Sequence, residues 1–265
     1  MTRLTKIAKP DTCVITNIGT CHLENLGDRD GVLKAKTEIF QSMKPNGHIV
    51  LNGDDDKLAT VREYNGVKPV FFGLDDKRDV YADQIESRGL KGVACSIHLG
   101  EDVFDVLVPT PGIHMVYNAL AAAAVGRIYG LTIEEIKKGI ESLETIRGRF
   151  KMIETDKFLV VDDCYNANPM SMKASLDVLH DGEGRRVAIL GDMGELGEDE
   201  VALHEGVGIH AASCGIDACV CVGELAHHIA EAARKANPDF TVYYEKSRES
   251  LLEHLTDYVQ KGDTI

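Results

Sequence analysis

The chain has 265 residues, of which 44% are hydrophobic, and this composition suits a folded protein of about two domains rather than a disordered chain. Its 29 Lys and Arg oppose 43 Asp and Glu, which leaves a net charge of −14. A surface this acidic repels nucleic acids and anionic membranes, so neither is an expected partner.

The cysteines and the N-terminal segment favour a reducing compartment. There are seven cysteines, an odd number without a C-x-x-C pair, which argues against a disulfide framework or a structural zinc site. The opening MTRLTKIAKPDT is polar, and no apolar run approaches the ~20 residues of a membrane span. We therefore expect a cytoplasmic protein without membrane insertion.

In the first half of the chain, short apolar runs alternate with segments of helical spacing. Strands are predicted at Cys13–Ile18, His48–Asn52 and Val70–Phe72, and helices at Asp30–Met43, Lys57–Tyr64, Met115–Tyr129 and Ile133–Leu143. The stretch Val80–Val108 consists of short alternating runs broken by glycine, which predicts antiparallel strands.

Thr145–Phe150 (TIRGRF) is typical of a linker, and we expect domains at residues 1–146 and 147–265. After the linker, strands are predicted at Phe158–Val161, Val187–Leu190, Cys219–Val222 and Val242–Tyr244, with helices at Met170–Leu179, Glu200–Ser213, Leu225–Ala236 and Arg248–Val259. This order predicts an α/β fold with a mostly parallel sheet and helices on both faces. The last residues, KGDTI, indicate a turn and the start of another strand.

A polar loop, Asn17–Leu26, follows the first strand at the end where open α/β sheets build their ligand sites. Its His22 could offer a neutral imidazole to a metal, or it could only hydrogen-bond to its neighbours. In the next helix, Lys34 and Lys36 are two residues apart and therefore point to different faces. One of them could be solvated while the other points toward the loop.

Two adjacent carboxylates, Asp162 and Asp163, follow a predicted strand, and Asn166 comes shortly after them. Asn168 and Pro169 suit the N-cap and the first position of the next helix. Capping does not account for the paired carboxylates, since carboxylates at this edge of a sheet typically face a ligand, a metal or a ribose.

Two further residue sets leave alternatives open. The glycines of VAILGDMGELG are spaced G-x-x-G-x-x-G, and Glu195 among them would crowd a pyrophosphate, so the segment is a weak dinucleotide motif and an NAD-dependent oxidoreductase ranks low. His204, in the helix that follows, is either structural or part of the same crevice. Asn118, in an Ala-rich helix, either bonds another helix or contacts a flat ligand such as a base.

Seven motifs follow one another in the order and spacing of the Mur ligases: ITNIGTCHLENLG, GVLKAKTEIF, LNGDDD, PTPGIHMVYNALAAAA, IRGRF, DDCYNANPMSMKASLDVL and ILGDMGELG. From about Asp11 to the end the chain resembles this family, and YNANP and GDMGELG resemble the branch that adds D-alanyl-D-alanine. The resemblance implies the second half of a central ATPase domain followed by most of a Rossmann-like C-terminal domain. The sequence contains no G-x-x-x-x-G-K-[ST] phosphate loop.

The resemblance also implies site residues. His22 matches a magnesium ligand, and Lys36 matches a lysine carried as a carbamate, whose negative charge suits two Mg²⁺ ions. Family members bind ATP, and the matching residues in this chain are Asn118 and His114 on one helix, with Arg149 and Asp163 reaching ATP when the domains close. Catalytic roles fall to Lys36, His22 and Asp163, and contact with the incoming substrates to Asn166, Asn168 and Glu195.

The chain departs from the family pattern at two positions. The helix start reads His114-Met115-x-x-Asn118 instead of H-N-x-x-N, which leaves the contact of the first Asn in doubt. Lys151 stands where an acidic residue is frequent.

The implied reaction is ATP-driven amide formation. The γ-phosphoryl group passes to the terminal carboxylate of UDP-MurNAc-tripeptide, and the amine of D-Ala-D-Ala then attacks the acyl phosphate. Without a phosphate loop the chain is expected to be inactive alone. An alternative is a binding or interaction module that keeps weak affinity for the nucleotide or the dipeptide. A half domain with an open sheet edge is also expected either to self-associate through that edge or to be poorly ordered there.

Overall fold

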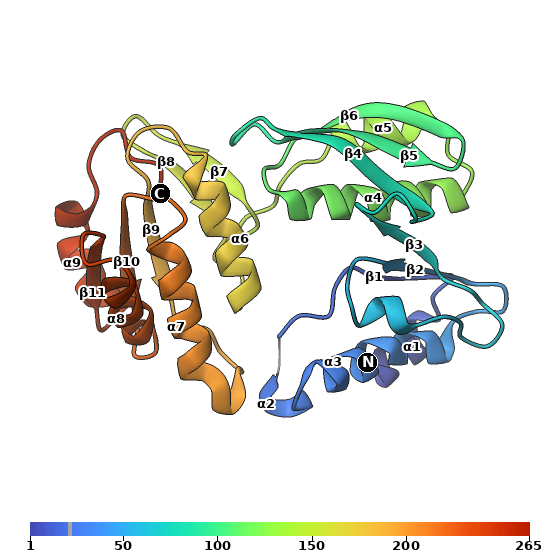
Figure 1. Cartoon of the computed structure of the whole chain (residues 1–265), viewed down its shortest axis with the longest axis horizontal. Coiled ribbons are helices and arrows are strands. Elements are labelled where there is room, and N and C mark those ends of the chain that lie inside the picture. The colour runs from blue at the N-terminus through green and yellow to red at the C-terminus, as the bar shows by residue number, and fades with distance from the viewer. Residues whose placement is uncertain (21–22) are drawn as a thin grey trace. The chain divides into compact units, whose positions relative to one another are not determined.

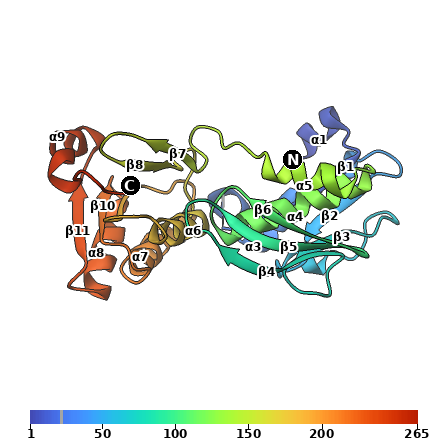
Figure 2. The ribbon, with the colours of Figure 1, turned by 90° about the horizontal axis from the view of Figure 1, so that it is seen from above.

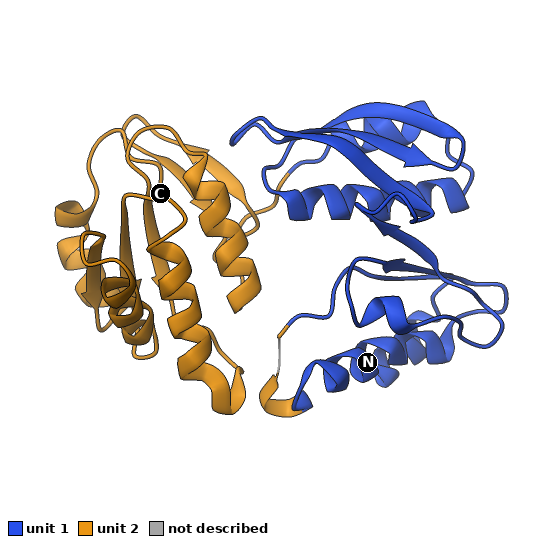
Figure 3. Cartoon of the chain, in the orientation of Figure 1, with its two compact units in different colours: residues 1–19, 26–144 blue, residues 20–25, 145–265 orange. Residues whose placement is uncertain are grey.

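The computed structural model describes residues 1–20 and 23–265, so His22 lies outside the described residues. The chain divides into two compact units (Figure 3). Unit 1 comprises Met1–Gly19 and Leu26–Glu144, and unit 2 comprises Thr20–Asn25 and Thr145–Ile265. Across the described ranges, no helix has both the length and the apolar character that crossing a membrane requires.

Unit 1 is built on a six-stranded sheet whose strands lie in chain order (Figure 1). The first four strands pair in parallel and the last three in antiparallel fashion, which confirms the prediction for Val80–Val108. The strands are β1 (Thr12–Ile15), β2 (His48–Asn52), β3 (Val70–Gly73), β4 (Val80–Ser87), β5 (Val93–Leu99) and β6 (Asp102–Val108). Among these strands, β1 forms one edge of the sheet.

The helices in the first part of the chain are α1 (Thr2–Ala8), α2 (Leu23–Leu26), α3 (Arg29–Thr37), α4 (Ile113–Ile128) and α5 (Ile133–Glu141), with 3₁₀ turns η1 (Glu38–Ser42) and η2 (Leu58–Thr60). The helix predicted at Lys57–Tyr64 is wrong, because only η2 forms there. The Asp55 carboxylate accepts the amides of Lys57 and Leu58, and this turn chemistry competes with a longer helix. Helix α1 was not predicted, since its sequence is mostly polar.

The core of unit 1 lies between the sheet and α4. Val116, Leu120, Ala123 and Ala124 of α4 are buried against residues of β2 to β6, and their mostly small side chains let the helix lie close to the sheet. On α5, Ile136 and its neighbour one turn on, Ile140, close the same core. This packing fixes the position of α4, whose first turns carry His114 and Asn118.

Unit 2 contains parallel strands β9 (Val187–Gly191), β10 (Ala218–Val222) and β11 (Thr241–Glu245) in the order β11-β10-β9. The predicted parallel arrangement is therefore confirmed for these strands. A separate antiparallel hairpin consists of β7 (Lys151–Glu154) and β8 (Leu159–Asp162). The sequence did not predict β7, because its short run KMIE is half charged and mostly exposed.

Helices cover both faces of the β9–β11 sheet (Figure 2). They are α6 (Pro169–His180), α7 (Glu200–Ala211), α8 (Ala226–Ala236) and α9 (Arg248–Tyr258), with a 3₁₀ turn η3 (Gly197–Asp199) before α7. Side chains alternate along β10: Cys219 and Cys221 pack with α6, α7 and α8, whereas Ala218 and Val220 pack with Leu251 of α9.

Candidate functional site

Asp162 ties the linker to the carboxyl end of β8. Its Oδ2 accepts the backbone N–H of Gly148 at 3.0 Å, and its Oδ1 accepts the Cys164 thiol at 2.9 Å. The backbone N–H of Tyr165 donates in turn to the Gly148 carbonyl at 3.1 Å. Gly148 sits at φ +76°, a conformation that favours glycine. The first of the paired carboxylates therefore has a structural role.

These contacts also change two ionisation equilibria. The hydrogen bond from the Cys164 thiol, together with the Gly148 amide, lowers the pKa of Asp162. The same bond raises the pKa of Cys164, since the neighbouring carboxylate disfavours the thiolate. Although Cys164 is exposed, it is therefore held in the less reactive thiol form.

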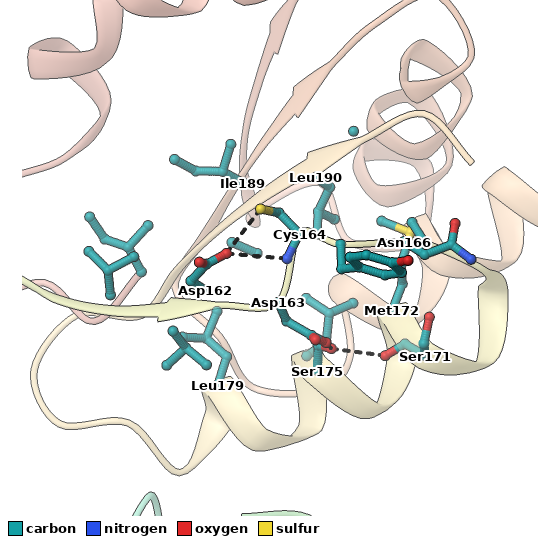
Figure 4. Close-up of a pocket in the computed structure, with 18 of the residues that line it drawn as sticks. Asp162, Asp163, Cys164, Asn166, Ser171, Met172, Ser175, Leu179, Ile189 and Leu190 are labelled. Atoms are coloured by element: carbon teal, nitrogen blue, oxygen red, sulfur yellow. Dashed lines mark hydrogen bonds between the residues drawn. The ribbon is translucent and has the colours of Figure 1, made fainter. Parts of the chain in front are cut away.

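The second carboxylate, Asp163, lines a cavity of about 680 Å³ in unit 2 (Figure 4). The Ser175 hydroxyl donates to Asp163 Oδ2 at 2.7 Å, which orients the carboxylate from α6. Tyr165, Asn166 and Ser171 line the cavity as well. The structure thus brings Asp163 and Asn166 to one polar mouth of this cavity, just after the carboxyl end of β8.

Arg149 lies next to this mouth because it stacks on Tyr165. The guanidinium carbon is 4.2 Å from the centroid of the tyrosine ring, within the range of a cation–π contact. Tyr165 is 71% exposed, so its ring is available to a ligand as well as to Arg149. Sequence reasoning missed Tyr165, and the only signal for it was an aromatic residue two positions after the paired carboxylates.

The capping interpretation of Asn168 and Pro169 is confirmed. Asn168 Oδ1 accepts the backbone N–H groups of Met170 at 3.1 Å and Ser171 at 3.0 Å, and Pro169 is the first residue of α6. Since its oxygen is used in this way, Asn168 has only its amide NH₂ group to offer to a substrate.

The fully buried side chain of His204 is hydrogen-bonded to the backbone of the GDMGELG loop. The Met193 N–H donates to His204 Nε2 at 3.0 Å, and His204 Nδ1 donates to the Glu200 carbonyl at 2.6 Å. One nitrogen accepts and the other donates, which requires the neutral tautomer. The structural alternative for His204 is therefore confirmed.

Glu195, in the same loop, has φ +58°, a conformation uncommon for a residue other than glycine. Its carbonyl accepts the Glu24 N–H at 3.4 Å, within unit 2. The backbone of Gly197 also approaches Glu24 closely, since an added Cβ would lie 3.3 Å from its Cα. These contacts place the backbone of Glu24 against the GDMGELG loop.

In unit 1, Lys36 points to the loop after β1. Its Nζ donates to the Asn17 carbonyl at 2.8 Å and lies 3.5 Å from Asn17 Oδ1. Lys34 lines a different pocket of unit 1 together with Glu38 and Tyr64, so the two lysines do point to different faces. Within the described part of the chain, no three His, Cys, Asp or Glu side chains are grouped to hold a metal ion.

Asn118 is exposed on α4 and lines a cavity of about 400 Å³ between α4 and α5. Its amide Nδ2 lies 3.4 Å from the Met115 sulfur, a weak acceptor in the same helix. Most of the wall is apolar, with Ala119, Ile136 and other residues of the two helices. His114 is half-buried in the first turn of α4. Unit 1 therefore holds Lys36, Asn118 and His114, and unit 2 holds the remaining described candidates.

Two family profiles match the chain. The Mur ligase middle domain matches residues 1–126, and the Mur ligase, glutamate ligase domain matches residues 148–265. Among curated relatives, the UDP-N-acetylmuramoyl-tripeptide–D-alanyl-D-alanine ligase of Bacillus subtilis is 34% identical over 265 residues, which cover 99% of the chain and 57% of the relative. The Escherichia coli enzyme of the same name is 36% identical over 230 residues, 86% of the chain and 51% of the relative.

The chain also matches solved structures of Mur ligases. MurF from Acinetobacter baumannii superposes with a TM-score of 0.87 at 32% identity, over 99% of the chain and 57% of that structure. The MurF ligase from Thermotoga maritima in complex with ADP has a TM-score of 0.84 at 28% identity, over 99% of the chain and 59% of that structure. The chain thus spans between 51% and 59% of the length of these relatives.

Proposed function

The chain belongs to the Mur ligase family, and from that premise we propose that it serves the ATP-dependent ligation of D-Ala-D-Ala to UDP-MurNAc-tripeptide in peptidoglycan precursor synthesis, in the cytoplasm. The observation that carries the proposal is the match of nearly the whole chain, through both units, to ligases named for this reaction. The conformation of unit 2 supports it, because a guanidinium and a carboxylate are fixed near one cavity mouth.

In unit 2, Arg149 and Asp163 are the proposed contacts to ATP. Arg149 offers a positive charge suited to phosphate oxygens, and its stacking on Tyr165 limits the conformations it must lose on binding. The bond from Ser175 fixes the Asp163 carboxylate. We assign Asn166, Asn168 and Glu195 to the incoming dipeptide or to ATP, with Asn168 contributing its NH₂ group.

In unit 1, Lys36 as a carbamate and His22 are the proposed ligands of two Mg²⁺ ions, which would neutralise phosphate charge when bound. An unmodified ammonium would repel these ions. The observed environment of Lys36 suits the modification, because a carbamate nitrogen keeps one N–H that can still donate to the Asn17 carbonyl. Its two new oxygens supply the kind of anionic ligand that Mg²⁺ requires.

The adenine of ATP is assigned to the cavity beside Asn118 and His114. The mostly apolar wall between α4 and α5 suits a flat ring, and the Asn118 amide makes only a weak contact with the Met115 sulfur. Met115 replaces the first Asn of the family pattern, so the contact which that residue makes in relatives is not available here.

The proposal is tested by phosphate release in the presence of Mg-ATP, UDP-MurNAc-tripeptide and D-Ala-D-Ala. We expect none from these 265 residues alone, because the sequence contains no phosphate loop to hold the β- and γ-phosphates. A fusion with the parts of the Bacillus subtilis relative that the chain does not cover should release phosphate only when the dipeptide is present. The same fusion with Arg149→Ala or Asp163→Asn should lose most of this release.

Two results would contradict the proposal. Release by the fusion that does not depend on the dipeptide would exclude the ligation, and release by the 265-residue chain itself would exclude the need for a phosphate loop. A dose-dependent thermal shift of the chain with ATP or the dipeptide, without turnover by the fusion, would favour a binding module instead. Self-association through the β1 edge stays a proposal, and sedimentation at several concentrations tests it.

A further inference from the structure

One peptide group of unit 1 is hydrogen-bonded on both of its sides by charged side chains. It joins Asn17 to Ile18, shortly after β1. Lys36 Nζ donates to its carbonyl oxygen at 2.8 Å, and its N–H donates to Asp55 Oδ2 at 2.7 Å. A trans peptide group is planar, with its N–H and C=O pointing in opposite directions, so the direction of the N–H sets that of the C=O. The carboxylate of Asp55 therefore determines where the acceptor of Lys36 lies.

Asp55 is itself fixed in the turn that follows β2. Its second oxygen, Oδ1, accepts the backbone N–H groups of Lys57 at 3.0 Å and of Leu58 at 2.9 Å. The side chain is only 9% exposed, so water competes little for these bonds or for the bond from Ile18. A carboxylate that accepts three backbone N–H groups in such a place is a rigid reference point for the loop after β1.

Ile18 is also held at its other backbone group and at its side chain. Arg29 Nε donates to the Ile18 carbonyl at 2.9 Å, and the guanidinium forms a bidentate pair with Asp56. The same guanidinium lies 3.9 Å from Asp55 Oδ2, and the Ile18 side chain is 1% exposed. One cluster of charges thus fixes the residue directly after Asn17, whose carbonyl receives the lysine.

We propose that Asp55 is a positioning residue for Lys36, acting through the Asn17–Ile18 peptide group that lies between them. The inference deepens the proposed function and rests on it for the role of Lys36, whereas the positioning rests on these contacts alone. A carbamate on Lys36 keeps one N–H for the Asn17 carbonyl, so its orientation depends on the same peptide group. Without the bond to Asp55 the peptide group can rotate, and the bond to Lys36 weakens.

The test variant is Asp55→Asn, because an amide side chain has one acceptor oxygen where a carboxylate has two. We expect this oxygen to remain with the N–H groups of Lys57 and Leu58, so that the Ile18 N–H loses its acceptor. Asp55→Ser is a second variant with the same purpose. Its hydroxyl can still bond the turn, but it is too short to reach Ile18 as well.

The matched control is Asp54→Asn, on the same turn. The Asp54 carboxylate accepts equally many hydrogen bonds, but from other groups: the Leu74 N–H, Arg78 Nε and the Tyr117 hydroxyl. The readout is the rate at which N-hydroxysuccinimidyl acetate acetylates Lys36 at constant pH in buffer free of carbon dioxide, followed by peptide mass spectrometry. Lys34, which lines another pocket, is the internal reference in every chain.

In Asp55→Asn, the acetylation rate of Lys36 relative to Lys34 should rise about threefold to tenfold, as expected for the loss of one hydrogen bond. In ¹³C-bicarbonate, the Lys36 carbamate resonance should fall by a similar factor. Asp54→Asn should change neither. An unchanged ratio in Asp55→Asn, or an equal rise in both Asn variants, would overturn the proposal.

Should Asp55→Asn fail to fold, Asp55→Ser must raise the ratio instead, and no rise would equally overturn the proposal. A chain that shows no carbamate, but whose Lys36 responds to Asp55→Asn and not to Asp54→Asn, would support the positioning and contradict the carbamate of the proposed function.

Discussion

The guanidinium of Arg149 lies 4.2 Å from the centre of the Tyr165 ring. This contact connects the linker segment Thr145–Phe150 to the DDCYNANP segment. Two backbone contacts accompany the stacking, since Gly148 donates to Asp162 and accepts from Tyr165. The proposed ATP contact Arg149 is thus held by groups that belong to the same cavity mouth as Asp163.

A double-mutant cycle tests the stacking. Arg149→Ala, Tyr165→Ala and the double mutant should reveal a coupling energy of about 0.5–1 kcal/mol in urea unfolding, the range for an exposed cation–π pair. Tyr165→Phe keeps the ring and should retain the coupling. Single-mutant effects that simply add would show that the two side chains do not stabilise each other.

Replacing Asp162 tests whether its carboxylate fixes the linker. Asp162→Asn should lower the free energy of unfolding by about 1 kcal/mol at pH 7, because it weakens the bonds from Gly148 and Cys164. Asp156→Asn, on an exposed turn, is the control and should have little effect.

The pH dependence of this effect has a defined sign. The pKa of Asp162 is lowered in the folded chain, so the unfolded chain binds a proton more readily. The stabilisation is therefore complete above the unfolded value near 4 and is lost as the pH falls through the folded value. The difference between wild type and Asp162→Asn should be constant from pH 7 to pH 5 and shrink below pH 4. A difference that grows toward low pH would contradict this role.

Alkylation of Cys164 reports on the same bond from the other side. Because the Asp162 carboxylate raises the pKa of Cys164, iodoacetamide should modify this exposed thiol more slowly at pH 7 than a free cysteine. Asp162→Asn should accelerate the reaction several-fold, as followed by peptide mass spectrometry. The rate at Cys214, which has other neighbours, should not change, and a parallel increase there would indicate general loosening instead.

His204 is expected to contribute strongly to the stability of unit 2. His204→Ala should cost about 2–4 kcal/mol, since it leaves the Met193 amide without its acceptor and opens a cavity in the core. His210→Ala, on the same helix but partly exposed in an ion pair with Asp177, should cost under about 1 kcal/mol. Equal losses from the two variants in denaturant unfolding would refute the assignment.

Carbamylation of Lys36 is measurable without turnover. In ¹³C-bicarbonate, the chain should show a carbamate resonance that disappears in Lys36→Gln and persists in Lys34→Gln, because Lys34 points to another pocket. The signal should increase with pH, since only the neutral amine reacts with carbon dioxide. A resonance that survives in Lys36→Gln would assign the modification to another lysine.

The sequence alone determined the features that depend on nearby residues. The cap formed by Asn168 and Pro169 is readable because a capping side chain bonds to amides two and three residues ahead. The antiparallel strands of Val80–Val108 and the parallel β9–β11 follow from local alternation and from strand–helix order. The family follows from seven motifs in a fixed order, whereas the proposed roles of individual site residues still require experiment.

The tertiary structure decided what depends on contacts between distant segments. Local pattern left His204 with two interpretations, and only its burial beneath the Met193 amide separates them. The charged strand β7 forms because β8 pairs with it, and Thr264 pairs with both Leu159 and Arg186, which are distant from it along the chain. These strand partners accept and donate hydrogen bonds to backbone N–H and C=O groups, which nearly every residue carries. The local sequence therefore does not indicate which distant segment will pair with a given strand.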